Sequence, residues 1–145
     1  MQKVLLSALP QLAAEVLKKL KTKNTATVVA LSGDLGAGKT TFVQALGKEL
    51  GVTETMQSQT YVLMKKYEIK KALPFKTLVH IDAYRLNNAE EFAALKPEQF
   101  LSDPKALVVV EWPERVGAAL PKADLTLNFS SLAAEDEERY IGVQE

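Results

Sequence analysis

The sequence predicts a three-layer α/β fold with a largely parallel central sheet. Two observations lead to this fold class. The segments "TATVVALS" (25–32) and "ALVVVEW" (106–112) are apolar, rich in β-branched residues and of strand length, as is typical of strands buried on both faces. Helical patterns lie on either side of the first segment, and such alternation favours parallel strands covered by helices. A chain of 145 residues suits one domain, so we expect residues 1–145 to form a single unit.

The first half of the chain predicts a helix, a buried strand and a second helix. Apolar residues recur at helical spacing near the N-terminus: Leu9, Leu12, Ala13, Val16, Leu17 and Leu20. Pro10 is tolerated only near the first turn of a helix, so the helix should begin there. The strand over 25–32 is stopped by Gly33. The second helix, over 39–50, is closed by Gly51 at its C-terminus.

The second half of the chain adds strands and one short helix. In chain order the pattern predicts strands over 60–69, 77–84 and 106–112, a helix over 88–95, and turns at Pro74 and 102–104. Residues 124–129 alternate between apolar and polar, and a further strand over 139–143 follows an acidic loop. This pair predicts an antiparallel C-terminal edge of the sheet.

Composition excludes several function classes. The formal net charge is zero, so no chain-wide basic field favours direct binding to nucleic acid or membrane. The chain has no cysteine, which excludes disulfides, zinc–thiolate sites and thiol nucleophiles. Its apolar runs are far shorter than the roughly 18 residues of a membrane span. Polar residues interrupt the apolar N-terminal segment, so we expect a cytoplasmic protein rather than a secreted one.

The most informative segment is "SGDLGAGKTTF" (32–42). It contains the pattern G-x-x-x-x-G-K-[ST] without a mismatch, between a predicted strand and a predicted helix. Glycines allow backbone amides to approach a phosphate, and the helix N-terminus adds unpaired amides. The Lys39 ammonium can reach the β- and γ-phosphates, and the Thr40 hydroxyl can ligate Mg²⁺. The predicted nucleotide-binding residues are Gly33, Asp34, Leu35, Gly36, Ala37, Gly38, Lys39, Thr40 and Thr41.

Two acids stand at strand ends, where α/β sheets place functional groups. Asp82 lies near the end of "LVHID" and Glu111 at the end of "LVVVE". Burying such a carboxylate without a partner would be costly. We therefore favour a role for these acids in a site beside the phosphate loop over the alternative that each only caps the segment after its strand. We favour Glu111 as the acid that contacts Mg²⁺ through water or activates the attacking water, with Asp82 as the second acid near the metal. The two roles could be exchanged.

For other polar and aromatic residues near these acids, a structural role is favoured over a functional one. His80, the only histidine, would share a strand face with Asp82, although a buried core histidine is the more common outcome. For Trp112 we favour packing in the core over stacking on a nucleotide base. For Arg85 we favour a surface ion pair over stabilisation of a transition state. Four lysines form a modest basic patch that more often marks a solvated edge than an RNA contact: Lys65, Lys66, Lys70 and Lys71.

Five segments together resemble a known family. They are "SGDLGAGKTTF" (32–42), "SQTY" (58–61), "HIDAYRL" (80–86), "EWPERV" (111–116) and "DEERYIGV" (136–143). In order and spacing they are similar to the TsaE (YjeE-type) family of bacterial ATPases, which take part in making threonylcarbamoyladenosine in transfer RNA. The resemblance implies a P-loop NTPase fold and places Lys39 and Thr40 in the phosphate-loop roles, with Asp82 and Glu111 as the family's acids.

The resemblance also implies partners and a switch. Such proteins bind ATP and Mg²⁺, hydrolyse ATP poorly alone and act with TsaB-type and TsaD-type proteins. The TsaD-type protein is the transferase, tRNA contact is indirect, and ATP turnover resets the assembly. The family's S-P-T-F segment falls on residues 58–61 and makes Thr60 a candidate nucleotide-responsive residue. Gln59 and Tyr61 depart from the family's proline and phenylalanine, and losing proline removes a fixed φ from this segment.

Three other functions compete with a partner-activated ATPase. A small GTPase would carry an N-K-x-D motif, which the chain lacks. A small P-loop kinase would need a lid with several arginines to clamp phosphoryl groups, whereas the three arginines here are widely spaced: Arg85, Arg115 and Arg139. A nucleotide-gated binding module without meaningful turnover is the remaining alternative, and it would tolerate the loss of Glu111.

Overall fold

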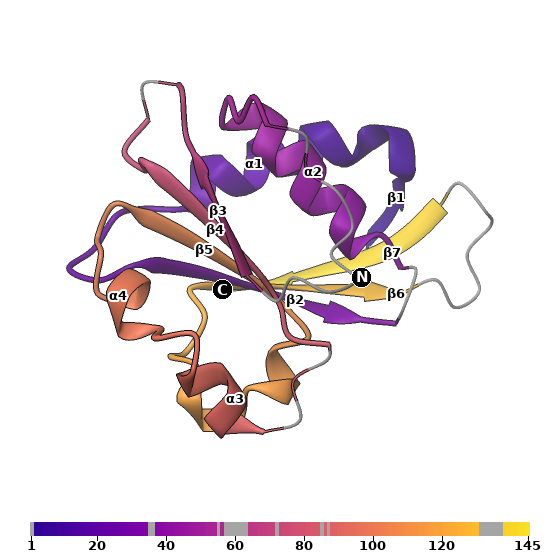
Figure 1. Ribbon diagram of the computed structural model, residues 1–145. Coiled ribbons are helices and arrows are strands. Elements are labelled where there is room, and N and C mark those ends of the chain that lie inside the picture. The colour runs from indigo at the N-terminus through magenta and orange to yellow at the C-terminus, as the bar shows by residue number, and fades with distance from the viewer. Residues whose placement is uncertain are drawn as a thin grey trace.

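A seven-stranded sheet organises the chain (Figure 1). The computed structural model describes residues 2–34, 37–54, 56, 64–71, 73–84, 86, 88–130 and 138–145. The strand order is β1-β7-β6-β2-β5-β4-β3. The strands are β1 (Gln2–Leu5), β2 (Thr27–Gly33), β3 (Met64–Glu68), β4 (Thr77–Asp82), β5 (Ala106–Glu111), β6 (Leu125–Ser130) and β7 (Glu138–Gln144).

The four central strands are parallel, as the sequence predicts. β2 pairs in parallel with β5 on one side and β6 on the other, and β4 pairs in parallel with β5. Every residue of β5 is buried, as are the first five of β2. A strand covered on both faces loses its alternation and becomes a continuous apolar run, which explains why these two strands were the clearest in the sequence.

The edges of the sheet are antiparallel. β6 and β7 form the predicted C-terminal pair, with Phe129 opposite Ile141. β7 is not the outermost strand, however, because β1 pairs with it in antiparallel register. At the other edge β3 pairs with β4 in antiparallel register, Lys65 lying opposite His80. The sheet is therefore more mixed than its parallel centre alone suggests.

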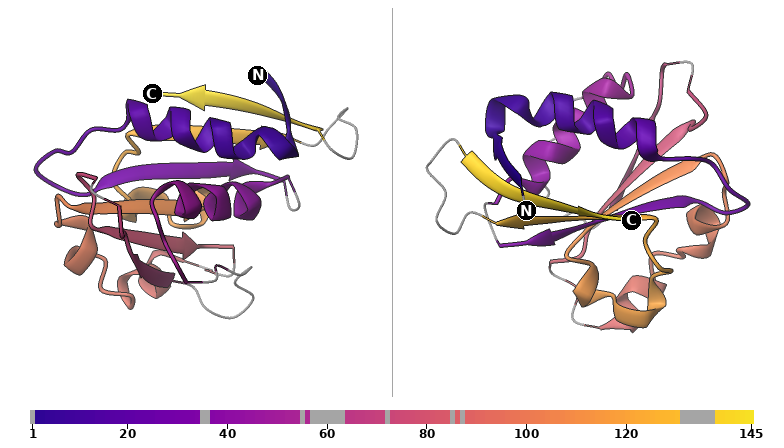
Figure 2. Two further views of the ribbon diagram at one scale, coloured as in Figure 1. Left: turned by 90° about the horizontal axis from the view of Figure 1, so that it is seen from above. Right: turned by 180° about the vertical axis from the view of Figure 1, so that it is seen from behind.

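Helices cover both faces of the sheet and complete three layers (Figures 1 and 2). One face carries α1 (Leu9–Lys19) and α2 (Lys39–Glu49), and the other carries α3 (Ala89–Ala93) and α4 (Glu98–Leu101). Short 3₁₀ turns occupy Leu6–Ala8, Pro113–Arg115 and Gly117–Ala119. Neighbouring residues of β5 face opposite layers: Val109 packs with the α1–α2 side and Val108 with the α3–α4 side. Among the described residues, no helix has the length and apolar character needed to cross a membrane.

The observed helices agree with most of the predicted boundaries. Pro10 lies in the first turn of α1, and Gly51 follows α2 with a φ of 76°, the left-handed geometry of a glycine C-cap. The predicted helix over 88–95 spans residues 89–93, and the Asn88 side chain accepts a hydrogen bond from the Glu91 amide at its N-terminus. Of the strand predicted over 60–69, the described part begins at Met64.

Two positions of the phosphate loop require glycine for different structural reasons. Gly38 is the N-cap of α2 and has a φ of 104°, which L side chains rarely adopt. Gly33 ends β2 opposite Phe129 of β6, and a Cβ there would lie 2.2 Å from the Phe129 carbonyl oxygen. Gly33 is thus required by the close approach of β6, in addition to any contact that the loop makes with phosphate.

Candidate nucleotide-binding site

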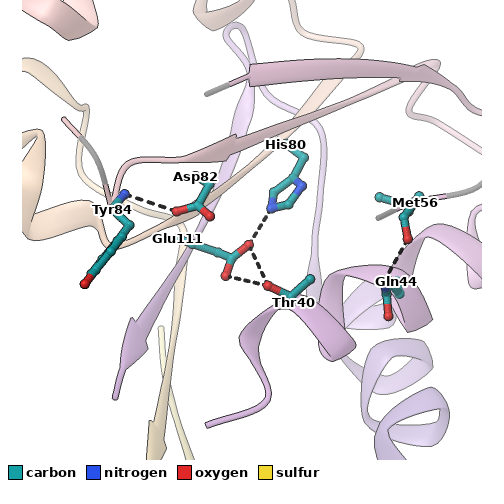
Figure 3. Close-up of polar contacts among 7 residues, drawn as sticks. All are labelled: Thr40, Gln44, Met56, His80, Asp82, Tyr84 and Glu111. Atoms are coloured by element: carbon teal, nitrogen blue, oxygen red, sulfur yellow. Dashed lines mark hydrogen bonds and ion pairs between the residues drawn. The ribbon is translucent and has the colours of Figure 1, made fainter. Parts of the chain in front are cut away.

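The strand register brings the predicted site residues together at one edge of the sheet. Parallel strands β4 and β5 end side by side, and Asp82 lies directly opposite Glu111. Helix α2 begins at Lys39, immediately after the loop that follows β2, so Thr40 reaches the same edge. Figure 3 shows Glu111 between Thr40 and His80, with Asp82 beside it.

Thr40 and Glu111 are in direct contact. The Thr40 hydroxyl donates to the Glu111 carboxylate, with Oγ1 3.2 Å from Oε1 and 3.5 Å from Oε2. The Glu111 residue is 2% exposed. A buried carboxylate needs hydrogen-bond donors, and the first turn of α2 supplies one of them.

His80 supplies a second donor to Glu111. Its Nε2 lies 2.6 Å from Glu111 Oε2, and both side chains are 3% exposed. An ionised carboxylate only accepts hydrogen bonds, so this contact requires the proton on Nε2. His80 is therefore the buried histidine that the sequence favoured, and it also touches the site, which the sequence left as the less common outcome.

Lys39 is held by its own loop. The ammonium donates to the carbonyl oxygens of Gly33 and Asp34, the second at 2.9 Å. The residue is only 4% exposed, and burial lowers the pKa of Lys39 despite the attraction of four surrounding carboxylates: Glu111, Glu114, Asp34 and Asp82. Lys39 is therefore held by backbone carbonyl oxygens and lies in a field of carboxylates.

Asp82 is the less buried of the two acids. Its Oδ1 accepts a hydrogen bond from the Tyr84 amide at 3.1 Å. Burial raises the pKa of Asp82, the nearby Glu111 charge adds to this, and the Tyr84 amide opposes it. Asp82 and Glu111 thus differ in environment: among the described contacts, Glu111 has two side-chain donors and Asp82 has a backbone donor.

Trp112 leaves the strand in an unusual conformation. Its φ of 61° and ψ of 53° place a bulky residue in the left-handed region, which costs about 1–3 kcal/mol. Its amide donates to the Leu31 carbonyl at 3.1 Å. The ring centroid lies 4.0 Å from the Lys39 Nζ and 5.1 Å from the Tyr84 ring. The predicted packing role thus includes a cation–π contact with the phosphate-loop lysine.

One further contact lies a turn along α2. The Gln44 amide nitrogen donates to the Met56 carbonyl at 2.8 Å (Figure 3). Gln44 follows Thr40 by four residues and therefore lies on the same face of the helix. A Cβ on Gly47 would lie 2.3 Å from the Met56 sulfur, so this glycine lets Met56 approach the helix.

Not every predicted site residue is described. Leu35, Gly36 and Thr60 lie outside the described residues, as does Arg85. The structure brings together Lys39, Thr40, Asp82 and Glu111. Gly33, Asp34, Ala37, Gly38 and Thr41 lie in the loop and the first turn of α2.

From the sequence, a contact between His80 and the site was the less favoured outcome, and nothing indicated the contact between Trp112 and Lys39. Alternation along β4 placed His80 on the face of Asp82, but its contact with Glu111 depends on a register in which His80 lies opposite Val109. The left-handed φ of Trp112 had no signal in the sequence, because the proline that follows favours an extended conformation at this residue.

A strand, a glycine loop and a helix, with two acids on adjacent parallel strands, define the class of P-loop nucleotide-binding proteins. The family model "Threonylcarbamoyl adenosine biosynthesis protein TsaE" matches residues 6–141. The chain therefore belongs to the TsaE family.

Individual relatives agree with this assignment. A protein named tRNA threonylcarbamoyladenosine biosynthesis protein TsaE from Synechocystis is 44% identical over 62% of this chain and 56% of its own length. The protein of the same name from Haemophilus influenzae is 36% identical over 80% of this chain and 70% of its own. The crystal structure of Bacillus subtilis YdiB superposes with a TM-score of 0.72 at 27% identity, covering 97% of this chain and 80% of that one.

Proposed function

We propose that this chain binds ATP with Mg²⁺ and hydrolyses it as the energy-coupling subunit of tRNA threonylcarbamoyladenosine synthesis. Its turnover is weak alone and rises on assembly with a TsaD-type transferase and a TsaB-type protein, whose cycle it resets. tRNA contact is indirect, through the partners, which would place the chain in the cytoplasm. Membership of the TsaE family supports a role in threonylcarbamoyladenosine synthesis. The arrangement of the phosphate loop and the two acids supports ATP hydrolysis as the reaction.

The contact between the Thr40 hydroxyl and the Glu111 carboxylate carries the proposal. A phosphate loop needs an acid that can orient water and help hold the metal, and here that acid is hydrogen-bonded to the loop's own hydroxyl residue. The contact spans residues 71 positions apart in the chain. A glycine-rich turn that bound nothing would not require a buried carboxylate at this place.

The residues at this edge fit Mg²⁺ delivered with a nucleotide. Within the described parts of the chain, no cluster of three or more His, Cys, Asp or Glu side chains could hold a metal by itself. Mg²⁺ prefers oxygen ligands and is commonly bound by one or two protein groups together with substrate phosphates. Thr40, Glu111 and Asp82 supply such oxygens. When bound there, Mg²⁺ would neutralise charge on the β- and γ-phosphate oxygens.

The chain's own residues would bind the phosphates and activate the attacking water. The Lys39 ammonium would exchange its two backbone carbonyl acceptors for phosphate oxygens, and the amides at the start of α2 would add further donors. Glu111 would orient the attacking water and accept its proton, while Asp82 would act as the second acid near the metal. The exchange of these two roles is the alternative assignment.

An autonomous small kinase is the first competing function. Such an enzyme needs several cations to clamp a transferring phosphoryl group. Two arginines are described: Arg115 lies 5.5 Å from the Tyr84 ring centroid, and the Arg139 Cγ lies 3.8 Å from the position of a Cβ on Gly38. A nucleotide-gated binding module is the second, and it would share the same loop while needing no catalytic carboxylate.

The test is steady-state ATP hydrolysis by the protein alone and with a matched TsaB–TsaD pair. Glu111→Gln keeps the side-chain volume and removes the base, so we expect it to lower partner-stimulated kcat by about 10²- to 10⁴-fold. Glu68→Gln is the matched control, because Glu68 is 71% exposed and pairs only with Lys70 among the described contacts. This control should retain full turnover.

Each alternative has its own outcome. Low turnover that stays unchanged in a confirmed assembly, and a Glu111→Gln variant that still supports tRNA modification, would favour the binding module. Brisk turnover without partners, with phosphate transferred to a small acceptor, would favour the kinase. Either result would overturn the proposed function.

A further inference from the structure

Among the described residues, His80 is the buried polar group at this edge of the sheet that the proposed reaction does not use. It lies in the middle of β4, is 2% exposed, and faces the same layer as Asp82. A polar side chain buried this deeply requires a partner, since leaving it unpaired would be costly. Its partner is the carboxylate that we assign to water activation.

The two contacts to Glu111 act on its carboxylate from different elements. Thr40 approaches from the first turn of α2, whereas His80 approaches from β4 with a shorter separation of 2.6 Å. A glutamate has three rotatable side-chain bonds, so its carboxylate needs donors in fixed positions to keep one orientation. The His80 position is fixed on both sides, because β4 pairs there with Lys65 of β3 and with Val109 of β5.

We propose that His80 is a positioning residue that fixes the orientation of the Glu111 carboxylate for catalysis. This inference rests on the proposed function, because it gives His80 its role through the acid of that reaction. His80 acts by donating its Nε2 hydrogen bond to Glu111, and the histidine itself contacts neither nucleotide nor water. Partners that hold a functional carboxylate commonly change activity by about 10- to 100-fold when they are removed.

A purely structural histidine makes different predictions. If His80 only filled space and satisfied a buried acid, any variant that kept the fold would keep turnover in proportion to its stability. If His80 positions Glu111, turnover depends on a donor at the place of Nε2. The effect should also fall on kcat rather than on the KM for ATP, since Lys39 and the loop amides are unchanged.

Three substitutions separate these two roles. His80→Leu removes the donor. His80→Gln restores an N–H group the same number of bonds from Cβ as Nε2, whereas the amide of His80→Asn stops one bond short. Val79→Ala is the control for lost stability, because Val79 is fully buried on the same strand and faces the opposite layer.

The experiment combines hydrolysis in the TsaB–TsaD assembly, thermal melts and crystal structures of the Leu and Gln variants. We expect His80→Leu and His80→Asn to lower kcat by about 10- to 100-fold with KM little changed. His80→Gln should recover most of the loss, and Val79→Ala should melt lower without a comparable loss of kcat. In the crystal structures, the carboxylate of Glu111 should leave Thr40 in the Leu variant and keep its place in the Gln variant.

The outcomes separate the two proposals. Wild-type turnover with a His80→Leu variant of equal kcat would overturn the positioning role and leave the proposed function standing. A wild-type protein without turnover in the assembly would overturn the proposed function. In that case the crystal structures still decide the contact, since an unmoved Glu111 carboxylate in the Leu variant would show that His80 does not hold it.

Discussion

Replacing Thr40 with valine tests the central contact of the site by removing one oxygen. Valine keeps the branched shape and has a helix propensity similar to threonine, so the change isolates the hydroxyl. The Glu111 carboxylate then loses one of the two side-chain donors that the described part of the chain gives it. The expected result is a protein that is less stable in the absence of nucleotide and insensitive to Mg²⁺ in its presence.

The size of the effect follows from the geometry. A hydrogen bond to a charged group contributes about 1.5–3 kcal/mol. The separations of 3.2 and 3.5 Å are long for a hydroxyl donor, and His80 still binds Glu111, so the low end of about 1.5 kcal/mol applies. For a chain of this size, 1 kcal/mol shifts the melting temperature by about 2–4 °C, which gives a decrease of about 3–6 °C.

Thermal melts in three conditions provide the assay. In buffer alone, Thr40→Val should melt below wild type, while Thr40→Ser, which keeps the hydroxyl, should lie closer to wild type. With ATP, adding Mg²⁺ should raise the melting temperature of wild type and Thr40→Ser but not of Thr40→Val, because ligand binding stabilises the folded state. A valine variant that melts like wild type and responds equally to Mg²⁺ would refute the assigned role of this hydroxyl.

Two further substitutions address the charges at the site. Lys39→Met should weaken ATP binding by about 10- to 100-fold in calorimetric titrations, the loss expected for a charge-assisted hydrogen bond. Its melting temperature should equal or exceed that of wild type, because burial lowers the pKa of Lys39 and makes the charged form costly in the fold. Burial raises the pKa of Asp82, so the stability from its carboxyl is fully present below the unfolded pKa of about 3.9 and is lost as pH rises through the folded value. Asp82→Asn should therefore melt above wild type at pH 7, and melts at decreasing pH should show that difference shrinking.

The parts of the fold that the sequence predicted are those with strong local patterns. β5 and β2 are continuous apolar runs, and the phosphate loop is marked by glycines at fixed spacing. β1 was missed because its four residues lie at an edge, are mostly exposed and carry no alternation. The four-residue α4 was missed because so short a helix shows little periodicity.

In the candidate site, too, the residues with a local sequence pattern were predictable and the contacts between distant strands were not. Lys39, Thr40 and the two acids could be named from the motif and from the ends of strands. The hydrogen bond from His80 to Glu111 could not, because it depends on how β4 and β5 align, and pairing register is a long-range property. The cation–π contact of Lys39 depends on one backbone angle at Trp112.

The order of strands in the sheet has a consequence for synthesis of the chain on the ribosome. β2 and the phosphate loop emerge early, but the neighbours of β2 are β5 and β6, and the partner of β1 is β7. The nascent chain therefore carries its loop long before any strand can hold that loop in place, and Glu111 arrives with the same late segment. A product terminated before β5 would contain an intact motif but neither Glu111 nor the two strands that flank β2. Its unpaired apolar strand would be prone to aggregation.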